Sequence, residues 1–135
     1  MSADVIPPGL LRAFRATRYE ADGIDVRIGR RSIEMDAWLS GMGARTGGFI
    51  TAWNPLSRRM PEGWNQRMQH RLAERLRRHA AVPARGVLHR WHEAHLLTTA
   101  HPARLLRLAR SFRQRGVVVI RRDQPARLML LDWRS

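Results

Sequence analysis

The sequence predicts one α/β domain, with an α+β arrangement as the open alternative, in which helices pack on a mixed β-sheet of about five to six strands. Segments with the apolar spacing of strands alternate along the chain with segments that have the spacing of helices. The chain has 135 residues, of which 44% are apolar, and this is enough for one hydrophobic core. We expect residues 1–9, which are rich in proline, to form a flexible N-terminus, and residues 10–135 to form the single domain.

Six segments have the composition of β-strands. The first two are expected to form a hairpin around Asp22-Gly23, a dipeptide typical of two-residue turns. The run Val-Val-Val-Ile at 117–120 predicts a buried strand, whereas Pro83 and Gly86 predict a break at 83–86. The predicted strands cover residues 16–21, 24–28, 49–53, 96–99, 117–120 and 127–132.

Four segments are predicted to be helices. Ser32 suits the N-cap of one of them, and Pro61 and Pro102 suit the first positions of two others. The helices are expected to begin near residues 10, 32, 61 and 102, and the last two are expected to end near residues 79 and 116.

The chain is strongly basic. Its formal net charge is +14, and all 25 of its basic residues are arginine. A charge of this size indicates nucleic acid or another polyanion as a partner, and arginine suits phosphate recognition. The complete absence of lysine beside many alanines is also typical of codon bias in a GC-rich genome, so both interpretations of the charge stay open.

The residues that the chain lacks exclude several kinds of site. Cysteine is absent, which excludes disulfides, thiolate nucleophiles and zinc sites built from cysteine. No apolar run reaches the ~18–20 residues that span a bilayer, so we expect no membrane partner. The first residues do not have the basic start and apolar block of a signal peptide, so we expect a cytoplasmic protein of a bacterium-like cell.

The segment Phe-Ile-Thr-Ala-Trp-Asn-Pro at 49–55 is the main candidate for a ligand site. The strand must stop at Asn54-Pro55, because proline donates no hydrogen bond to a sheet. Ligands bind near strand ends in sheets of this kind, and a helix that begins near residue 61 favours an anion there. We therefore predict a site for an anionic or nucleotide-like ligand. Asn54 would orient the ligand, Thr51 and Ser57 would form hydrogen bonds, and Arg58 would supply charge.

A simple turn is the alternative interpretation of this segment. In a turn, Asn54 satisfies backbone groups and Ser57 caps the segment that follows. Asn54 stands at a strand end, so we expect it to lie outside the core.

A second candidate site consists of Arg27 and Arg30, which flank Gly29 and precede Ser32. Two arginines beside a helix N-terminus have the chemistry to hold a carboxylate or a phosphate. The alternative, which we favour, is structural: Gly29 makes a turn and Ser32 caps the helix.

The histidine-rich segment 89–95 invites a metal interpretation. His89, His92 and His95 are three residues apart, and this spacing fits zinc templates poorly on a helix or on a strand. We predict surface or half-buried histidines and neither a metal nor a cofactor, and we expect Trp91 and Glu93 to border the ligand pocket. The sequence has no Gly-x-Ser-x-Gly motif, and it leaves open whether the protein is an enzyme.

Arginine stripes on the last two predicted helices support an alternative function. One interpretation is that they are the solvent-exposed faces that any packed amphipathic helix has. The other is that they form a track that binds the phosphates of nucleic acid independently of its sequence. A third possibility is a structural subunit whose tryptophans and arginines meet another protein. The oligomeric state is not predicted. The arginines of the stripes are Arg67, Arg71, Arg75, Arg78, Arg104, Arg107 and Arg110.

Several of these segments resemble a family of bacterial proteins that is known only as a domain of unknown function. The family's marks are a Thr-x-Tyr segment, an Arg-Ile-Gly turn, a Phe-Ile-Thr-Ala-x-Asn-Pro strand end and a Phe-Gly-Gln-Asn stretch. Their counterparts here are 17–19, 27–29, 49–55 and the region of Phe112 and Gln114. Arg113 and Arg115 stand where the family tends to have glycine and asparagine. The resemblance covers residues 13 to 120 and implies a shared fold but no reaction.

Overall fold

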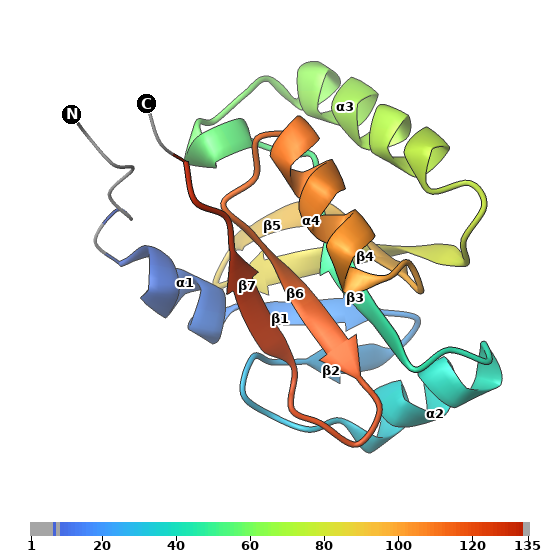
Figure 1. Ribbon diagram of the computed structural model, residues 1–135. Helices are drawn as coiled ribbons and strands as arrows, with labels where there is room; N and C mark the ends of the chain where they lie inside the picture. Colours follow the sequence, from blue (N-terminus) through green and yellow to red (C-terminus); the bar gives the residue numbers. More distant parts are fainter. Residues whose placement is uncertain (1–6, 8, 134–135) are drawn as a thin grey trace.

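The computed structural model describes residue 7 and residues 9–133, which form four α-helices, one short 3-10 helix and a seven-stranded sheet (Figure 1). Residues 1–6 and 8, which belong to the predicted N-terminal segment, lie outside the described residues. The helices are α1 (Leu10–Ala16), α2 (Ile33–Gly41), η1 (Pro55–Ser57), α3 (Glu62–Arg75) and α4 (Pro102–Ser111). The strands are β1 (Arg18–Ala21), β2 (Ile24–Val26), β3 (Thr46–Ile50), β4 (Ala81–Leu88), β5 (Trp91–Thr98), β6 (Gly116–Arg121) and β7 (Arg127–Leu130).

The sheet is antiparallel, so the prediction of a mixed sheet was wrong, and its seven strands are close to the predicted five to six. Its strand order is β2-β1-β4-β5-β3-β6-β7, and each pair of neighbouring strands is antiparallel. Three hairpins, β1–β2, β4–β5 and β6–β7, supply six of the strands, and β3 lies between the second and third hairpins. The fold is therefore α+β, the arrangement that the sequence left open.

Strand β4 is the strand that the sequence missed, because Pro83 and Gly86 predicted a break there. The antiparallel pairing of β4 with β1 covers only Arg85–Val87, so no β1 residue lies opposite Pro83 and its missing N–H costs nothing on that side. Gly86 pairs with Tyr19 on one side and with Glu93 on the other. Both residues thus have places in the sheet that only the tertiary structure defines.

Strand β3 begins and ends three residues earlier than predicted, at Thr46 and Ile50. Its first residues include Gly47 and Gly48, which the sequence does not mark as strand formers. A Cβ on Gly47 would lie 2.3 Å from the carbonyl oxygen of Thr98, and a Cβ on Gly48 would lie 2.6 Å from that of Val118. The two glycines therefore let the neighbouring strands approach β3 closely.

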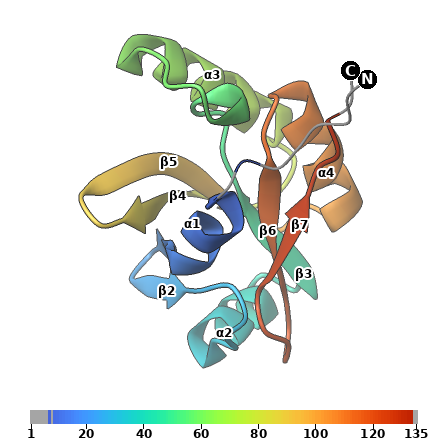
Figure 2. The same ribbon diagram turned by 90° about the vertical axis from the view of Figure 1, so that its left-hand side faces the viewer.

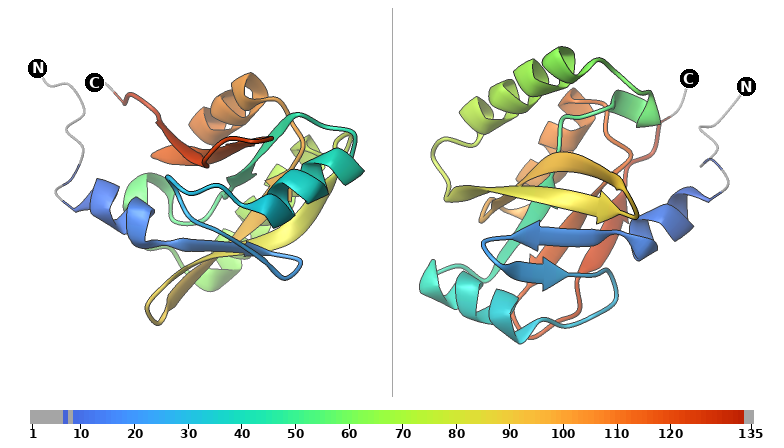
Figure 3. Two further views of the ribbon diagram at one scale, coloured as in Figure 1. Left: turned by 90° about the horizontal axis from the view of Figure 1, so that it is seen from below. Right: turned by 180° about the vertical axis from the view of Figure 1, so that it is seen from behind.

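The sheet curls until its two edge strands nearly meet, as Figure 3 shows from below. An isolated parallel bridge joins Ile28, just after β2, to Ala126, just before β7. The N–H of Gly29 donates to the carbonyl oxygen of Ala126 at 2.8 Å, and the N–H of Ala126 donates to the carbonyl oxygen of Arg30 at 3.1 Å. We call this contact the seam. It gives the sheet an inner, concave face and an outer, convex face.

Each face of the sheet has its own hydrophobic cluster. On the outer face, α3 and α4 pack through Leu72 and Leu105. On the inner face, Met35 and Leu39 of α2 are buried against side chains from the sheet, including Tyr19. Helix α1 lies in front of the opening of the curled sheet (Figure 2). The inner face is thus covered at one end by α2 and faces α1 at the other.

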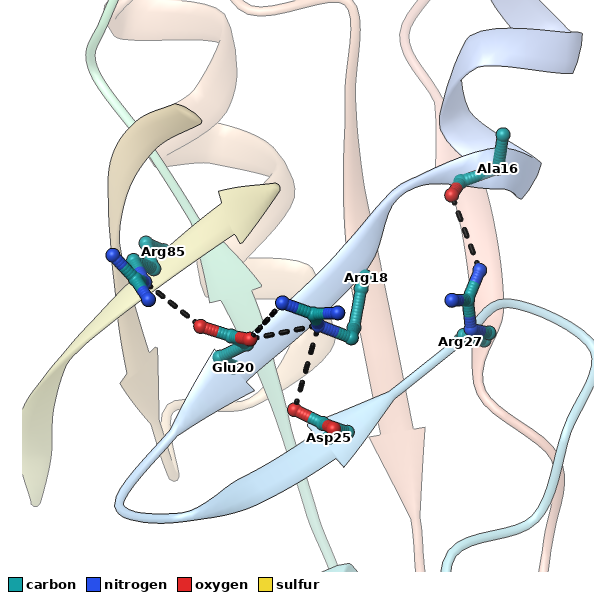
Figure 4. A network of polar contacts seen from close by, with 6 residues as sticks. All are labelled: Ala16, Arg18, Glu20, Asp25, Arg27 and Arg85. Carbon is teal, nitrogen blue, oxygen red and sulfur yellow. Dashed lines mark hydrogen bonds and ion pairs between the residues drawn. The ribbon is translucent and has the colours of Figure 1, made fainter. Parts of the chain in front are cut away.

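Polar contacts fix the first hairpin and α1 to the rest of the sheet (Figure 4). Glu20 on β1 accepts hydrogen bonds from Arg85 Nε on β4 and from Arg18 Nε, both at 2.7 Å. The bond from Arg85, followed by that from Arg18, lowers the pKa of the Glu20 carboxyl. Arg27 Nη1 donates to the carbonyl oxygen of Ala16 at 3.2 Å, so it links the end of α1 to the segment after β2.

Candidate functional site

The segment that follows β3 has an unusual backbone. Asn54, Leu56 and Ser57 have φ angles of 48°, 49° and 64°, in the left-handed region that residues other than glycine rarely adopt. The N–H of Leu56 donates to the carbonyl oxygen of Arg113 at 2.6 Å, which ties the segment to the end of α4. Three strained residues within four positions mark this strand end as a candidate functional site.

The side chain of Asn54 is buried and forms hydrogen bonds through both its oxygen and its nitrogen, so the expectation that it lies outside the core was wrong. Its Oδ1 accepts from Met60 N and from Asn65 Nδ2, both at 2.9 Å, and its own N–H donates to Asn65 Oδ1 at 3.0 Å. Its Nδ2 donates to Glu93 Oε2 at 2.6 Å. Only 8% of Asn54 is exposed. Asn54 therefore joins the strand end, α3 and β5.

Glu93 lies where β5 passes this strand end. Burial raises the pKa of its carboxyl, and hydrogen bonds from the Asn54 and Trp91 side chains oppose that rise by favouring the ionised form. Thr51 fixes the same stretch of β5, since its Oγ1 donates to the carbonyl oxygen of Ala94 at 2.6 Å and accepts from Trp53 N at 3.0 Å. Asn54 and Trp91 therefore orient the Glu93 carboxylate, and Thr51 fixes the backbone beside it.

Trp91, Glu93 and His95 line one cavity of about 330 Å³, which we call the concave cavity. They lie on one face of β5, because side chains two residues apart point to the same side of a strand. Tyr19, Phe49 and Val118, which belong to the inner hydrophobic cluster, also line the cavity, and so do α1 residues. The cavity thus occupies the inner face of the curled sheet, between the strands and α1.

His95 is held as a neutral imidazole inside the cavity. Burial lowers its pKa to about 4. Its Nδ1 lies 3.1 Å from the carbonyl oxygen of Glu93, which can only accept, so Nδ1 carries the proton. The ring has room because residue 86 is glycine: a Cβ there would lie 3.0 Å from His95 Cε1. The ring also meets Tyr19 edge-on, with 5.5 Å between ring centroids, and burial raises the pKa of the Tyr19 phenol.

The solvent side of the cavity carries positive charge. Arg59 is exposed, and its guanidinium lies 5.1 Å from the centre of the Trp91 ring, which is itself 42% exposed. Arg115 and Gln114 also line the cavity. Gln114 Nε2 donates to the carbonyl oxygen of Trp53 at 3.0 Å, which fixes the strand end from the side of α4. The arrangement combines aromatic walls, buried acceptors and arginines near solvent.

The structure brings together some of the residues predicted from the sequence. Thr51, Asn54 and Ser57 line the concave cavity, whereas Arg58 is exposed and does not line it. Its neighbour Arg59 does line it, and so do Trp91 and Glu93, as the sequence suggested.

The second predicted site, Arg27 and Arg30, lies elsewhere. Arg27 bonds to Ala16, and the carbonyl of Arg30 belongs to the seam. The Ser32 hydroxyl accepts from the N–H of Met35 at 3.1 Å and caps α2, as the structural interpretation predicted.

Sequence reasoning missed Tyr19 and His95. Tyr19 comes from β1, far away in the chain, and no local pattern places it beside Glu93. A signal for His95 did exist: once the segment is taken as a strand, alternation places Trp91, Glu93 and His95 on one face. Of the other histidines in this segment, His89 lies in the turn, with φ of 54°, and His92 is exposed.

The arginines of the proposed nucleic acid track lie on the convex side, on or near α3 and α4. Helix α3 ends at Arg75 rather than at residue 79, so Arg78 lies beyond it. Arg104 Nη2 donates to the carbonyl oxygen of Arg75 at 3.1 Å, and the Arg110 guanidinium lies 5.3 Å from the centre of the Trp133 ring. Arg67, Arg71 and Arg107 are exposed.

The pKa of His95 predicts acid sensitivity. Its folded-state pKa of about 4 lies below its ordinary value of 6.5, so the neutral ring stabilises the fold above pH 6.5, and this stability is lost as the pH falls toward 4. We expect the loss to reach about 2–3 kcal/mol, reduced by Glu93, whose raised pKa acts in the opposite direction. Urea unfolding of the wild type and His95→Gln at several pH values measures this. A loss of the same size in both proteins would contradict it.

Among the described residues, no three His, Asp or Glu side chains gather closely enough to hold a metal ion. Within the same part of the chain, no helix has the length and apolar character needed to cross a membrane.

Part of the chain matches a known protein family. The family described as "Protein of unknown function (DUF3293)" matches residues 50–117, just over half of the chain. No curated protein and no solved structure matches the chain significantly. The matched region contains the strand end, Glu93, His95 and Gln114, so it includes most of the polar lining of the concave cavity.

Proposed function

We propose that this protein, which belongs to the DUF3293 family of proteins of unknown function, binds a small molecule in the concave cavity. The ligand has a flat apolar body and an anionic group. The observation that carries the proposal is the cavity itself: about 330 Å³, with aromatic walls, in which a carboxyl and an imidazole with shifted pKa values lie side by side. Small-molecule sites are concave and mostly apolar, with a few convergent polar groups.

The apolar body is inferred from the walls. Phe14, Tyr19, Phe49, Trp53 and Trp91 all line the cavity, and flat rings stack well against such side chains. A volume of about 330 Å³ is at the lower end of the usual range for ligand pockets, so the ligand is small.

The anionic group is inferred from Arg59, which is exposed beside Trp91, and from Ser57, whose hydroxyl is also near solvent. Arginine binds carboxylates and phosphates through two parallel N–H donors. The anionic end of the ligand would therefore point outward and its apolar body inward, toward Glu93 and His95. No contact in the structure favours the nucleic acid track or the partner subunit over this proposal, and both stay predictions.

Binding can be tested with tryptophan fluorescence, since Trp53 and Trp91 line the cavity. The probes are guanosine and adenosine monophosphates, 6-carboxypterin and indole-3-acetate, each a flat ring system with an anionic group. We expect at least one probe to bind with a Kd below about 1 mM. Trp91→Ala is expected to weaken that binding about tenfold or more, because it removes a wall of the cavity and the support of Arg59.

Trp64→Ala is the matched control, because Trp64 lies on α3 and does not line the cavity. It should leave the affinity unchanged. Failure of every probe to bind, or an equal loss of affinity in both variants, would count against a ligand site at this cavity.

A further inference from the structure

The inner part of the concave cavity offers hydrogen-bond acceptors for which the protein supplies too few donors. A carboxylate has about four lone-pair sites, and Glu93 receives hydrogen bonds from the side chains of Asn54 and Trp91. Within the part of the chain that the structure describes, no arginine forms an ion pair with Glu93. The carboxylate therefore keeps acceptor capacity that a ligand can use.

His95 adds a second acceptor beside the first. Because its Nδ1 donates to the carbonyl oxygen of Glu93, the neutral ring presents Nε2 as an unprotonated acceptor. Among the described residues, no donor forms a hydrogen bond with Nε2. This nitrogen is also not fully buried. Since His95 lines the cavity, Nε2 is accessible from inside it.

Two other polar side chains near Glu93, those of Asn54 and Thr51, already form hydrogen bonds within the protein. Asn54 employs both its Oδ1 and its Nδ2 within the protein, and Thr51 Oγ1 both donates and accepts. Asn54 is thus a positioning residue that holds the carboxylate rather than a group free to contact a ligand. At Glu93 and His95 themselves, the hydrogen-bonding capacity that the protein leaves over is that of two acceptors, and a ligand that meets them must bring donors.

We propose that the ligand presents to Glu93 and His95 a planar ring edge with an N–H beside an NH₂ group. Guanine and pterin rings both have this donor edge. The inference rests on the proposed function of the same cavity and names the ligand class. A flat heterocycle suits the aromatic walls, and an anionic substituent on it would face Arg59 on the solvent side.

The test compares ligands that differ only in the donor edge. Guanosine monophosphate has the exocyclic NH₂ group and inosine monophosphate lacks it; 6-carboxypterin has it and 6-carboxylumazine carries an oxygen in its place. We expect the ligand with the NH₂ group to bind about tenfold tighter or more in at least one pair, because its loss leaves a buried acceptor unpaired. The pair that contains the tightest-binding ligand shows whether the natural ligand is a nucleotide or a pterin.

Two variants test whether Glu93 is the residue that distinguishes ligands with the NH₂ group from ligands without it. Glu93→Gln is expected to bring the affinity ratio of the discriminating pair close to one, because an amide offers one acceptor oxygen and a competing NH₂ donor. Glu74→Gln is the matched control: Glu74 is exposed on α3 and does not line the cavity, so the ratio should stay unchanged. Thermal unfolding checks that the variants are folded. If Glu93→Gln does not fold, His95→Gln replaces it and should reduce the ratio.

The outcomes separate this inference from the proposed function. Equal affinities within both pairs, or binding of indole-3-acetate alone, would overturn the donor-edge inference and leave the ligand site standing. An affinity ratio that stays unchanged in Glu93→Gln would also overturn it, since a group other than Glu93 would then bind the donor edge. Absence of binding by every probe would overturn the proposed function and this inference together.

Discussion

Gly47→Ala is expected to prevent folding. The new Cβ would lie 2.3 Å from the carbonyl oxygen of Thr98 and 3.3 Å from Thr99 Cα, and both are backbone atoms of the chain beside β3. Backbone in the middle of a sheet cannot move without breaking ladder hydrogen bonds on both of its sides. We expect a loss above about 4 kcal/mol, which is a large part of the roughly 5–15 kcal/mol by which a typical domain is stable. Circular dichroism and urea unfolding measure the effect.

Gly63→Ala is the matched control for this substitution. Gly63 lies in the first turn of α3, where a Cβ would meet only Arg67 Nη1, at 3.7 Å. Alanine is a better helix former than glycine, so this variant should unfold at the same urea concentration as the wild type or a higher one. If Gly47→Ala is as stable as Gly63→Ala, the close approach of β3 and its neighbour is wrong.

Asn54→Ala is expected to cost about 3–5 kcal/mol of stability and to abolish ligand binding by the protein that still folds. The substitution leaves the buried Asn65 amide and the N–H of Met60 without their partner, and unpaired buried groups cost about 1–3 kcal/mol each. Alanine must also adopt a φ of 48°, which adds about 1 kcal/mol. Glu93 loses the donor that orients it, so the acceptor pair in the cavity is no longer fixed.

Asn54→Gly separates the two causes. Glycine adopts left-handed φ angles freely, so this variant keeps the backbone and loses only the side-chain hydrogen bonds. It should be about 1 kcal/mol more stable than Asn54→Ala and should bind ligand equally poorly. Urea unfolding and fluorescence titration of both variants provide the comparison. Full binding by either variant would show that Asn54 does not position Glu93.

The sequence predicted those elements whose signals are local. The turn at Asp22-Gly23, the cap at Ser32 and the buried strand near Val117 depend on residues within a few positions of one another. The strands that were missed or displaced depend on distant neighbours. Gly47 is a poor strand former alone, and its value lies in the space that it leaves for Thr98, about fifty residues away in the chain.

The residues of the candidate site also fall into those that a local rule predicts and those that depend on distant contacts. Thr51, Asn54 and Ser57 were predicted from a local rule, that Pro55 stops a strand, although β3 already ends at Ile50. The burial of Asn54 was not predicted, because it results from Asn65 on α3 and Glu93 on β5, and only the folded chain brings these residues to the strand end. Tyr19 reaches the cavity through the curl of the sheet, for which the sequence has no local signal.

The seam between the segments around Gly29 and Ala126 also bears on how copies of this protein meet at high concentration. An open sheet offers unpaired N–H and C=O groups along its outermost strands, and these recruit strands from other molecules into edge-to-edge aggregates. Here the outermost strands are only three and four residues long, and two backbone hydrogen bonds at the seam occupy groups of Gly29, Arg30 and Ala126, which lie close to these strands. Little template is left for strand addition, so the curl that encloses the cavity also protects the chain from polymerising through its sheet.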